Sequence, residues 1–256
     1  MLGKLLKYEI PSLGRKLVPL YAAWAATAVL MGLMIGPAQD KYPFMIVISA
    51  LLYTGVTTAI FVMAIIMIIQ RYRNSLLGDE AYFNMVLPVS ASAHITNKLI
   101  SALLWIVLTG IAAIVTTLII GFFGSESYSI PNVWKYVSPY INNDMMLMIV
   151  ETILISILGL VKTVLQIYTA ITIGYQAKQH VTLASIGAYI GVLIFESLVG
   201  RVFMAIFPAM GKQGVQFSNF AEYQHFAIPS ILIALFFSAI YFFICKTLLE
   251  KRLNLS

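Results

Sequence analysis

The sequence predicts an all-α integral membrane protein with six transmembrane helices. Hydrophobic residues make up 61% of the 256 residues, charged residues make up 10%, and the mean hydropathy is +0.92. Soluble domains are about 45–50% apolar and about 25% charged, so this composition excludes an ordinary soluble domain. A spanning helix needs about 20 apolar residues, and the chain has six long apolar runs in place of the short alternating segments of an outer-membrane barrel.

The six runs define a single transmembrane domain over residues 1–256. Each run is bounded by charged or turn-forming residues, and the fourth and fifth also carry charges inside them. The expected spans are 17–36, 44–69, 99–123, 145–175, 181–207 and 226–245.

The distribution of lysine and arginine predicts the orientation of the spans. Eleven of the 14 basic residues outside the runs fall on the side that holds both termini and the second and fourth connections. Cytoplasmic loops carry an excess of Lys and Arg, so both termini of this multi-pass membrane protein are expected in the cytoplasm. Topology accounts for most of the net charge of +6, and no nucleic-acid partner is expected.

Residues 1–16 are predicted to form an interfacial helix at the membrane surface. Leu2, Leu6 and Leu13 lie near helical spacing among basic residues, a pattern typical of helices in the headgroup plane. Pro11 is expected to kink or restart this helix. The alternative is a solvated basic leader.

The longest cytoplasmic connection, 70–98, is predicted to contain a short amphipathic helix. Leu76, Phe83 and Leu87 fall at i, i+7 and i+11, which forms one helical stripe. Asp79 and Glu80 are adjacent acids in an otherwise basic face. Such an element suits docking on a soluble partner, and the alternative is a structured loop with two solvated acids.

Two stretches are expected on the outer side. Residues 124–144 are rich in Tyr and Trp, which anchor at membrane interfaces. Residues 208–225 contain Pro208, Gly211 and Gly214 between aromatic residues. This second stretch is interpreted either as short re-entrant helices or as a plain loop.

The sequence offers no catalytic or metal-binding motif. It has no Walker A loop, no G-x-S-x-G and no H-E-x-x-H. His94, His180 and His225 lie on different connections, and Cys245 is interpreted as a small apolar residue near the inner end of the last span. The chain is therefore expected not to be an enzyme and to hold no cofactor or metal.

Four charged residues inside spans are the candidate translocation-path residues: Glu151, Lys162, Glu196 and Arg201. Charges in hydrocarbon are costly and usually face protein or water. A Glu151–Arg201 or a Glu196–Arg201 contact is geometrically open, which would leave Lys162 alone. The functional interpretation is a polar transport path, and the alternative is structural pairing between helices or a snorkelling Lys162.

The chain resembles the ABC-2 type transporter permeases. The opening LLKYEIPSLGRKLVPLY is similar to the start of these proteins, and the stretch RYRNSLLGDEAYFNMVLPVSASAHITNKL resembles the family's connection between spans two and three. Ala81 stands where the family usually has Gly. The matched positions are Ser75, Leu76, Gly78, Glu80, Tyr82, Phe83, Leu87, Pro88, Val89, Ser90 and Lys98.

The resemblance implies half of a type V ABC exporter. Two permease copies would pair in the bacterial plasma membrane, as a homodimer in the simplest case, and each would bind a separate ATPase subunit that carries ATP and Mg. In the family the element between spans two and three is a coupling helix that inserts into the ATPase. The residues carried over as ATPase-coupling are Leu76, Leu77, Gly78, Asp79, Glu80, Tyr82 and Phe83.

The implied cargo is amphipathic or hydrophobic. The size and sequence style are most similar to Gram-positive exporters of antimicrobial or toxin peptides, including phenol-soluble modulin exporters, so an amphipathic peptide or other lipophilic cargo is expected. The rival class is a self-contained ion-coupled transporter or a membrane scaffold. An adjacent reading frame with a Walker A loop would favour the exporter.

Overall fold

The computed structural model is a bundle of long helices. It describes residues 2–36, 42–78, 90–124, 138, 142–177, 180–208 and 220–253. Six helices in these ranges are long and apolar enough to cross a membrane, as the sequence predicts. They are α1 (Leu2–Ile35), α2 (Pro43–Leu76), α4 (Ala91–Gly124), α6 (Asn143–Gly174), α7 (Val181–Ile206) and α8 (Phe220–Leu253).

The first helix, α1, is continuous from Leu2 to Ile35 and includes Pro11 and Pro19. A kink or a restart was expected at Pro11, and the helix does not restart there. Proline is tolerated in membrane helices because neighbouring groups satisfy the backbone positions that it frees. The candidate span within α1 begins at Glu9, and the placement of residues 1–16 at the membrane surface stays a prediction.

The described chain divides into two compact units. The first comprises Met1–Arg71 and Ile100–Pro139, and the second comprises Tyr72–Leu99 and Tyr140–Ser256. The boundaries fall inside α2 and α4, so each of these two helices contributes to both units.

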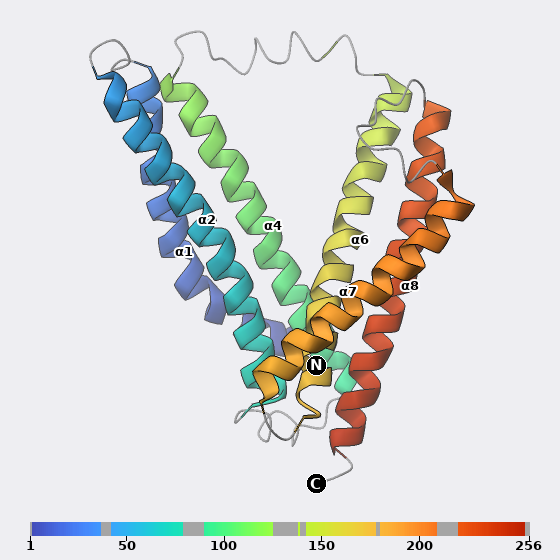
Figure 1. Ribbon diagram of the computed structural model, residues 1–256. Coiled ribbons are helices and arrows are strands. Elements are labelled where there is room, and N and C mark those ends of the chain that lie inside the picture. The colour runs from blue at the N-terminus through green and yellow to red at the C-terminus, as the bar shows by residue number, and fades with distance from the viewer. Residues whose placement is uncertain are drawn as a thin grey trace. The chain divides into compact units, whose positions relative to one another are not determined.

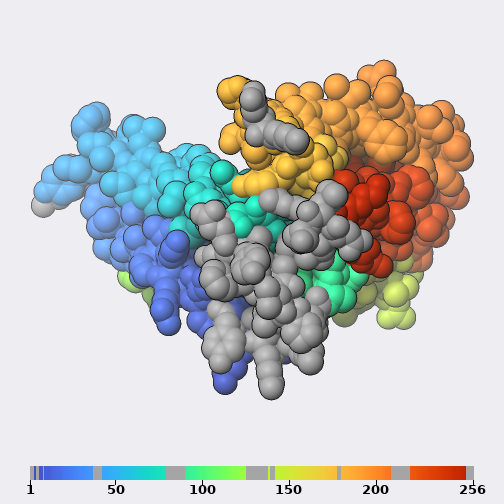
Figure 2. All heavy atoms as spheres, turned by 90° about the horizontal axis from the view of Figure 1, so that it is seen from below, coloured from blue at the N-terminus to red at the C-terminus, as the bar shows by residue number. Residues whose placement is uncertain are grey.

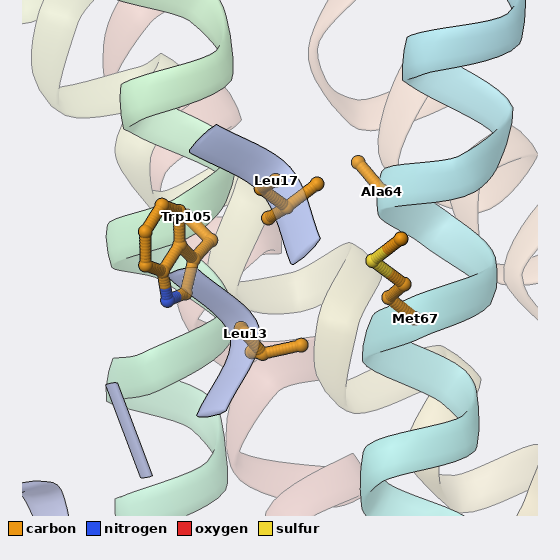
Figure 3. Close-up of a cluster of buried hydrophobic side chains, with 5 residues drawn as sticks. All are labelled: Leu13, Leu17, Ala64, Met67 and Trp105. Atoms are coloured by element: carbon orange, nitrogen blue, oxygen red, sulfur yellow. The ribbon is translucent and has the colours of Figure 1, made fainter. Parts of the chain in front are cut away.

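The first unit packs α1 against α2 and α4, which run side by side in Figure 1. Leu13 and Leu17 of α1 lie between Trp105 of α4 and the Ala64–Met67 surface of α2 (Figure 3). All five side chains are buried. This cluster packs α1, α2 and α4 together in one core.

Polar bonds between helices reinforce this core. Tyr21 of α1 and Thr109 of α4 are 2.6 Å apart through their hydroxyls, and Trp24 Nε1 of α1 donates to Thr57 Oγ1 of α2 at 2.8 Å. Arg71 of α2 donates to the buried Glu9 carboxylate of α1 through Nε at 2.7 Å and Nη2 at 3.2 Å. Such side-chain bonds help membrane helices to associate where lipid offers no hydrophobic drive.

The second unit is built on α6 and α8, with α7 packed beside them. Glu151 of α6 binds Gln224 of α8, and Thr169 further along α6 binds Tyr241 further along α8, so the two helices run in the same direction. Figure 2 shows the orange atoms of α7 beside the red atoms of α8. No residue of α7 is fully buried between Val181 and Ile206.

The connection between α2 and α4 is anchored on the second unit at both ends. Tyr72 of α2 stacks on Tyr168 of α6 with ring centroids 3.8 Å apart, and its hydroxyl lies 2.8 Å from Thr172 Oγ1. The Tyr168 hydroxyl donates to the backbone carbonyl of Lys98 in α4 at 3.2 Å. The last turn of α2 and the first turns of α4 thus rest on α6.

Candidate functional site

Two charged groups of the second unit, Lys162 and Glu196, meet where α6, α7 and α8 come together. Lys162 of α6 donates to Oε1 of Glu196 on α7 and forms an ion pair with it. Tyr241 of α8 donates to the other oxygen, Oε2, of Glu196 at 3.3 Å. We call Lys162, Glu196 and Tyr241 the charged triad, and it joins three helices through one carboxylate.

The pairing of Lys162 differs from the expectation that it stands alone. α6 ends 12 residues after Lys162, and α7 begins 15 residues before Glu196. At about 1.5 Å per residue the two side chains lie at nearly equal distances from the turn that joins the helices. Antiparallel neighbouring helices bring residues that are equidistant from the connecting turn to the same depth.

Glu151 is held separately, by a neutral amide. Gln224 Nε2 of α8 donates to both Glu151 oxygens, at 2.8 and 2.9 Å. Glu151 precedes Lys162 by 11 residues, which is about 16 Å along the helix axis, so it does not belong to the triad. Neither of the contacts that the sequence left open between a glutamate and Arg201 is formed.

Arg201 is exposed and makes no ion pair with any residue that the structure describes. It lies five residues before the end of α7. A long guanidinium side chain near a helix end reaches the headgroup level without a protein partner. This placement explains how an arginine is accommodated on the last turns of an apolar helix.

Aromatic rings surround one side of the triad. Phe195 precedes Glu196 on α7 and meets Phe237 of α8 edge-on, with centroids 6.2 Å apart. Phe237 in turn stacks on Tyr241 at 5.8 Å. A row of rings therefore runs from Tyr241 of the triad through Phe237 to Phe195, and Phe237 and Tyr241 are fully buried within it.

Two further polar groups lie buried near the same level. Gln166 Nε2 and Ser238 Oγ have no hydrogen-bond partner among the described residues, and both side chains are more than nine-tenths buried. Gln166 is one turn after Lys162 on α6. Ser238 follows Gln166 by 72 residues, the same separation as the bonded pair Thr169 and Tyr241, so the register places it opposite Gln166 on α8.

Part of the predicted ATPase-coupling segment is described. Leu76 ends α2, and Leu76 and Leu77 are buried with exposed fractions of 1% and 3%. Gly78 follows them and donates its backbone N–H to the Arg73 carbonyl at 2.8 Å. The remaining coupling residues lie outside the described residues: Asp79, Glu80, Tyr82 and Phe83. Residues 209–219 also lie outside, so the two interpretations of 208–225 stay open.

Three of the four charged residues that the sequence singled out, Glu151, Lys162 and Glu196, form side-chain contacts between helices. Sequence reasoning missed the uncharged partners Gln224 and Tyr241, which hold the two carboxylates. A search for every amide and tyrosine within the apolar runs would have found Tyr241 and Gln166, whereas Gln224 lies two residues before the last run. Among the described residues no group of three His, Cys, Asp or Glu side chains could hold a metal.

No family model, curated protein or solved structure matches this chain. The fold and the polar contacts therefore define its class on their own: a helical membrane protein with a charged triad inside its spanning helices.

Proposed function

We propose that this chain is the permease subunit of an ATP-driven ABC exporter, energised by a separate ATPase subunit. The observation that carries the proposal is the stretch from Ser75 to Lys98, which resembles the connection between spans two and three of ABC-2 permeases. The proposed cargo is amphipathic or hydrophobic, with peptides or toxins as the expected class. The proposed assembly is two permease copies in the bacterial plasma membrane with both termini in the cytoplasm.

The anchoring of the connection supports this role. Movement at an ATPase contact reaches the spans only through elements that are fixed to them. Tyr72 and the Lys98 carbonyl flank the connection, and both are held by α6. A push on residues 79–89 would thus be delivered to α6, the helix that carries Lys162.

Leu76 and Leu77 take a supporting part in this proposal. Because their side chains are buried within the chain, they position the connection and do not touch a partner. The direct ATPase contact is assigned to Asp79, Glu80, Tyr82 and Phe83. ATP and Mg belong to the partner subunit, which supplies the energy for switching between inward-open and outward-facing states.

The test takes an ATPase with a Walker A loop from a neighbouring reading frame and measures its copurification with this chain, followed by ATP hydrolysis of the complex. Glu80→Lys reverses an acid on the proposed contact and is expected to reduce copurification by about tenfold or more while leaving membrane insertion intact. Glu250→Lys is the matched control, because Glu250 is an exposed acid in the last turns of α8, on the same expected side of the membrane. Normal copurification and transport by Glu80→Lys would remove 79–83 as the coupling element.

A second candidate function is a self-contained ion-coupled transporter, and the charged triad is the observation that favours it. Ionisable groups within spans commonly mark ion or proton pathways. Reconstitution of the chain alone separates the two functions. Cargo movement that follows an ion gradient without any ATPase would favour this second candidate over the exporter.

A further inference from the structure

The members of the charged triad differ in how freely they can move when another cation approaches. Glu196 has a short side chain and is held by donors from two other helices, Lys162 and Tyr241. Lys162 has a long flexible stem, and such side chains move their ammonium toward water while the stem stays in apolar surroundings. The lysine can therefore leave the pair, whereas the carboxylate stays in place.

The pair is also within reach of a ligand. The side chains of Lys162 and Glu196 are 23% and 22% exposed, so neither is sealed inside the bundle. On the other side of Glu196, Tyr241 keeps its hydroxyl on the carboxylate. Gln166 supplies a buried amide donor without an acceptor, one turn from Lys162. The Tyr241 hydroxyl is thus a neutral donor that remains on the carboxylate when the lysine departs.

The charge of Glu196 selects the sign of the ligand. The carboxylate stays in place when the lysine departs, so an anion that competed for Lys162 would meet the Glu196 charge. Phe195 precedes Glu196 on α7 and is 47% exposed, whereas Phe237 and Tyr241 are each only 1% exposed. The exposed Phe195 ring therefore offers an aromatic surface to a cation, and aromatic faces attract cations through the negative charge of the ring face.

We propose that Glu196 is a binding site for an organic cation, and that Lys162 is the tethered cation that occupies it when no ligand is bound. The ligand class is an ammonium or guanidinium group on an apolar body, with the charge on Glu196 and the body against the exposed Phe195. This inference rests on the proposed function only in taking the ligand to be the exported cargo. Binding itself needs neither the ATPase nor ATP.

A tethered competitor makes a specific prediction. While Lys162 occupies Glu196, only the fraction of molecules with a free carboxylate can bind the cation, and the apparent dissociation constant for the cation is the intrinsic one divided by that fraction. Removing the lysine therefore lowers the apparent dissociation constant. Lys162→Met should therefore bind the cation at least about tenfold more tightly than the wild type. A purely structural ion pair would give the opposite result, because its loss would loosen the site.

The experiment measures binding by the purified chain in lipid nanodiscs. One arm uses a fluorescent amphipathic peptide with lysine side chains and its twin with norleucine in their place. The other arm uses a naphthylalkyl ammonium and its neutral amide, which distinguishes a peptide ligand from a small lipophilic one. The proteins are the wild type, Lys162→Met, the double variant Lys162→Met/Glu196→Gln, and Glu151→Gln as the control for a second carboxylate within the same helices.

Support requires that the cation binds better than its neutral twin, that Lys162→Met strengthens this preference, and that the double variant abolishes it while Glu151→Gln retains it. Equal binding of cation and neutral twin by the wild type overturns the proposal, as does a cation preference that survives in the double variant. If Lys162→Met fails to fold, the wild type and the charge-free double variant still decide. Cation binding by a chain that neither copurifies with an ATPase nor responds to ATP would uphold the site and reject the exporter.

Discussion

Two carboxylates inside apolar helices are bound by different kinds of donor. Glu196 is matched by a full positive charge and a hydroxyl, whereas Glu151 is held by the neutral amide of Gln224. An amide satisfies a carboxylate geometrically but leaves its charge, while an ammonium cancels it. The two sites therefore differ in what they offer to a mobile cation, and only Glu196 already holds one.

Arg201 shows what the sequence can and cannot predict about the partner of a single residue. The four charged positions were identified correctly as unusual, but their partners depend on helix register, which one sequence does not display. The expectation that Arg201 neutralises a glutamate is wrong, because both glutamates have partners on other residues. Gln224 and Tyr241 carry no charge and so gave no comparable signal.

Replacing Arg201 should have little effect on stability. Arg201→Met removes an exposed side chain without an ion pair among the described residues, and such surface changes usually alter the free energy of unfolding by less than about 0.5 kcal/mol. Thermal unfolding of Arg201→Met and Arg201→Lys in the same detergent measures this. A fall in melting temperature for Met that Lys reverses would mean that the charge has a structural partner after all.

At the scale of the element, the helices extend beyond their apolar runs. The sequence located all six, but α2 continues seven residues beyond the expected end at 69, and α8 begins six residues before 226 and ends eight residues after 245. An apolar run in the sequence marks only the part of a helix that can lie in the hydrocarbon core of the bilayer. Polar residues such as Arg71 and Tyr72 extend the helix because their side chains find partners on neighbouring helices.

The junction of α6 and α7 depends on a glycine at close approach. A Cβ at Gly174 would lie 2.5 Å from the Cα of Ser185, so Gly174→Ala must push α7 from the end of α6. Overpacking of this kind costs about 1–3 kcal/mol. Gly159→Ala on the same helix is the matched control, because nothing lies within 4 Å of a Cβ there, and it should stabilise by about 0.5–1 kcal/mol.

Thermal unfolding of the two alanine variants decides between close packing and a loose turn. The melting temperature should fall for Gly174→Ala and hold or rise for Gly159→Ala. Equal values for both would show that the helices separate at Gly174 without cost. The same comparison probes the geometry that sets Lys162 and Glu196 at one depth.

At the scale of the whole molecule, the orientation in the membrane is the prediction on which the rest depends. Both termini are expected inside and 124–144 outside, because 11 of 14 basic residues outside the runs fall on one side. Single cysteines at Ser90 and Ser127 in a Cys245→Ala background should react with a membrane-impermeant reagent from the inside and the outside respectively. The reverse pattern would place the proposed ATPase contact on the wrong side of the membrane.

The bonds from α6 to later helices also govern how the protein is made. Glu196 follows Lys162 by 34 residues, and Gln224 follows Glu151 by 73, so both charges of α6 are synthesised before their partners. Each isolated charge at a helix centre costs about 2.5–3.5 kcal/mol during insertion by the translocon.

We therefore expect a nascent chain ending after residue 178 to integrate α6 poorly, and one ending after 208 to integrate it well as a hairpin with α7. Glycosylation mapping of truncated translation products measures this, with Lys162→Leu/Glu151→Leu as the control that integrates at either length. Efficient integration of α6 alone would contradict the expectation. The expected result means that the helices of this protein insert in pairs and not one at a time, and that Lys162 stays at the translocon until Glu196 has been synthesised.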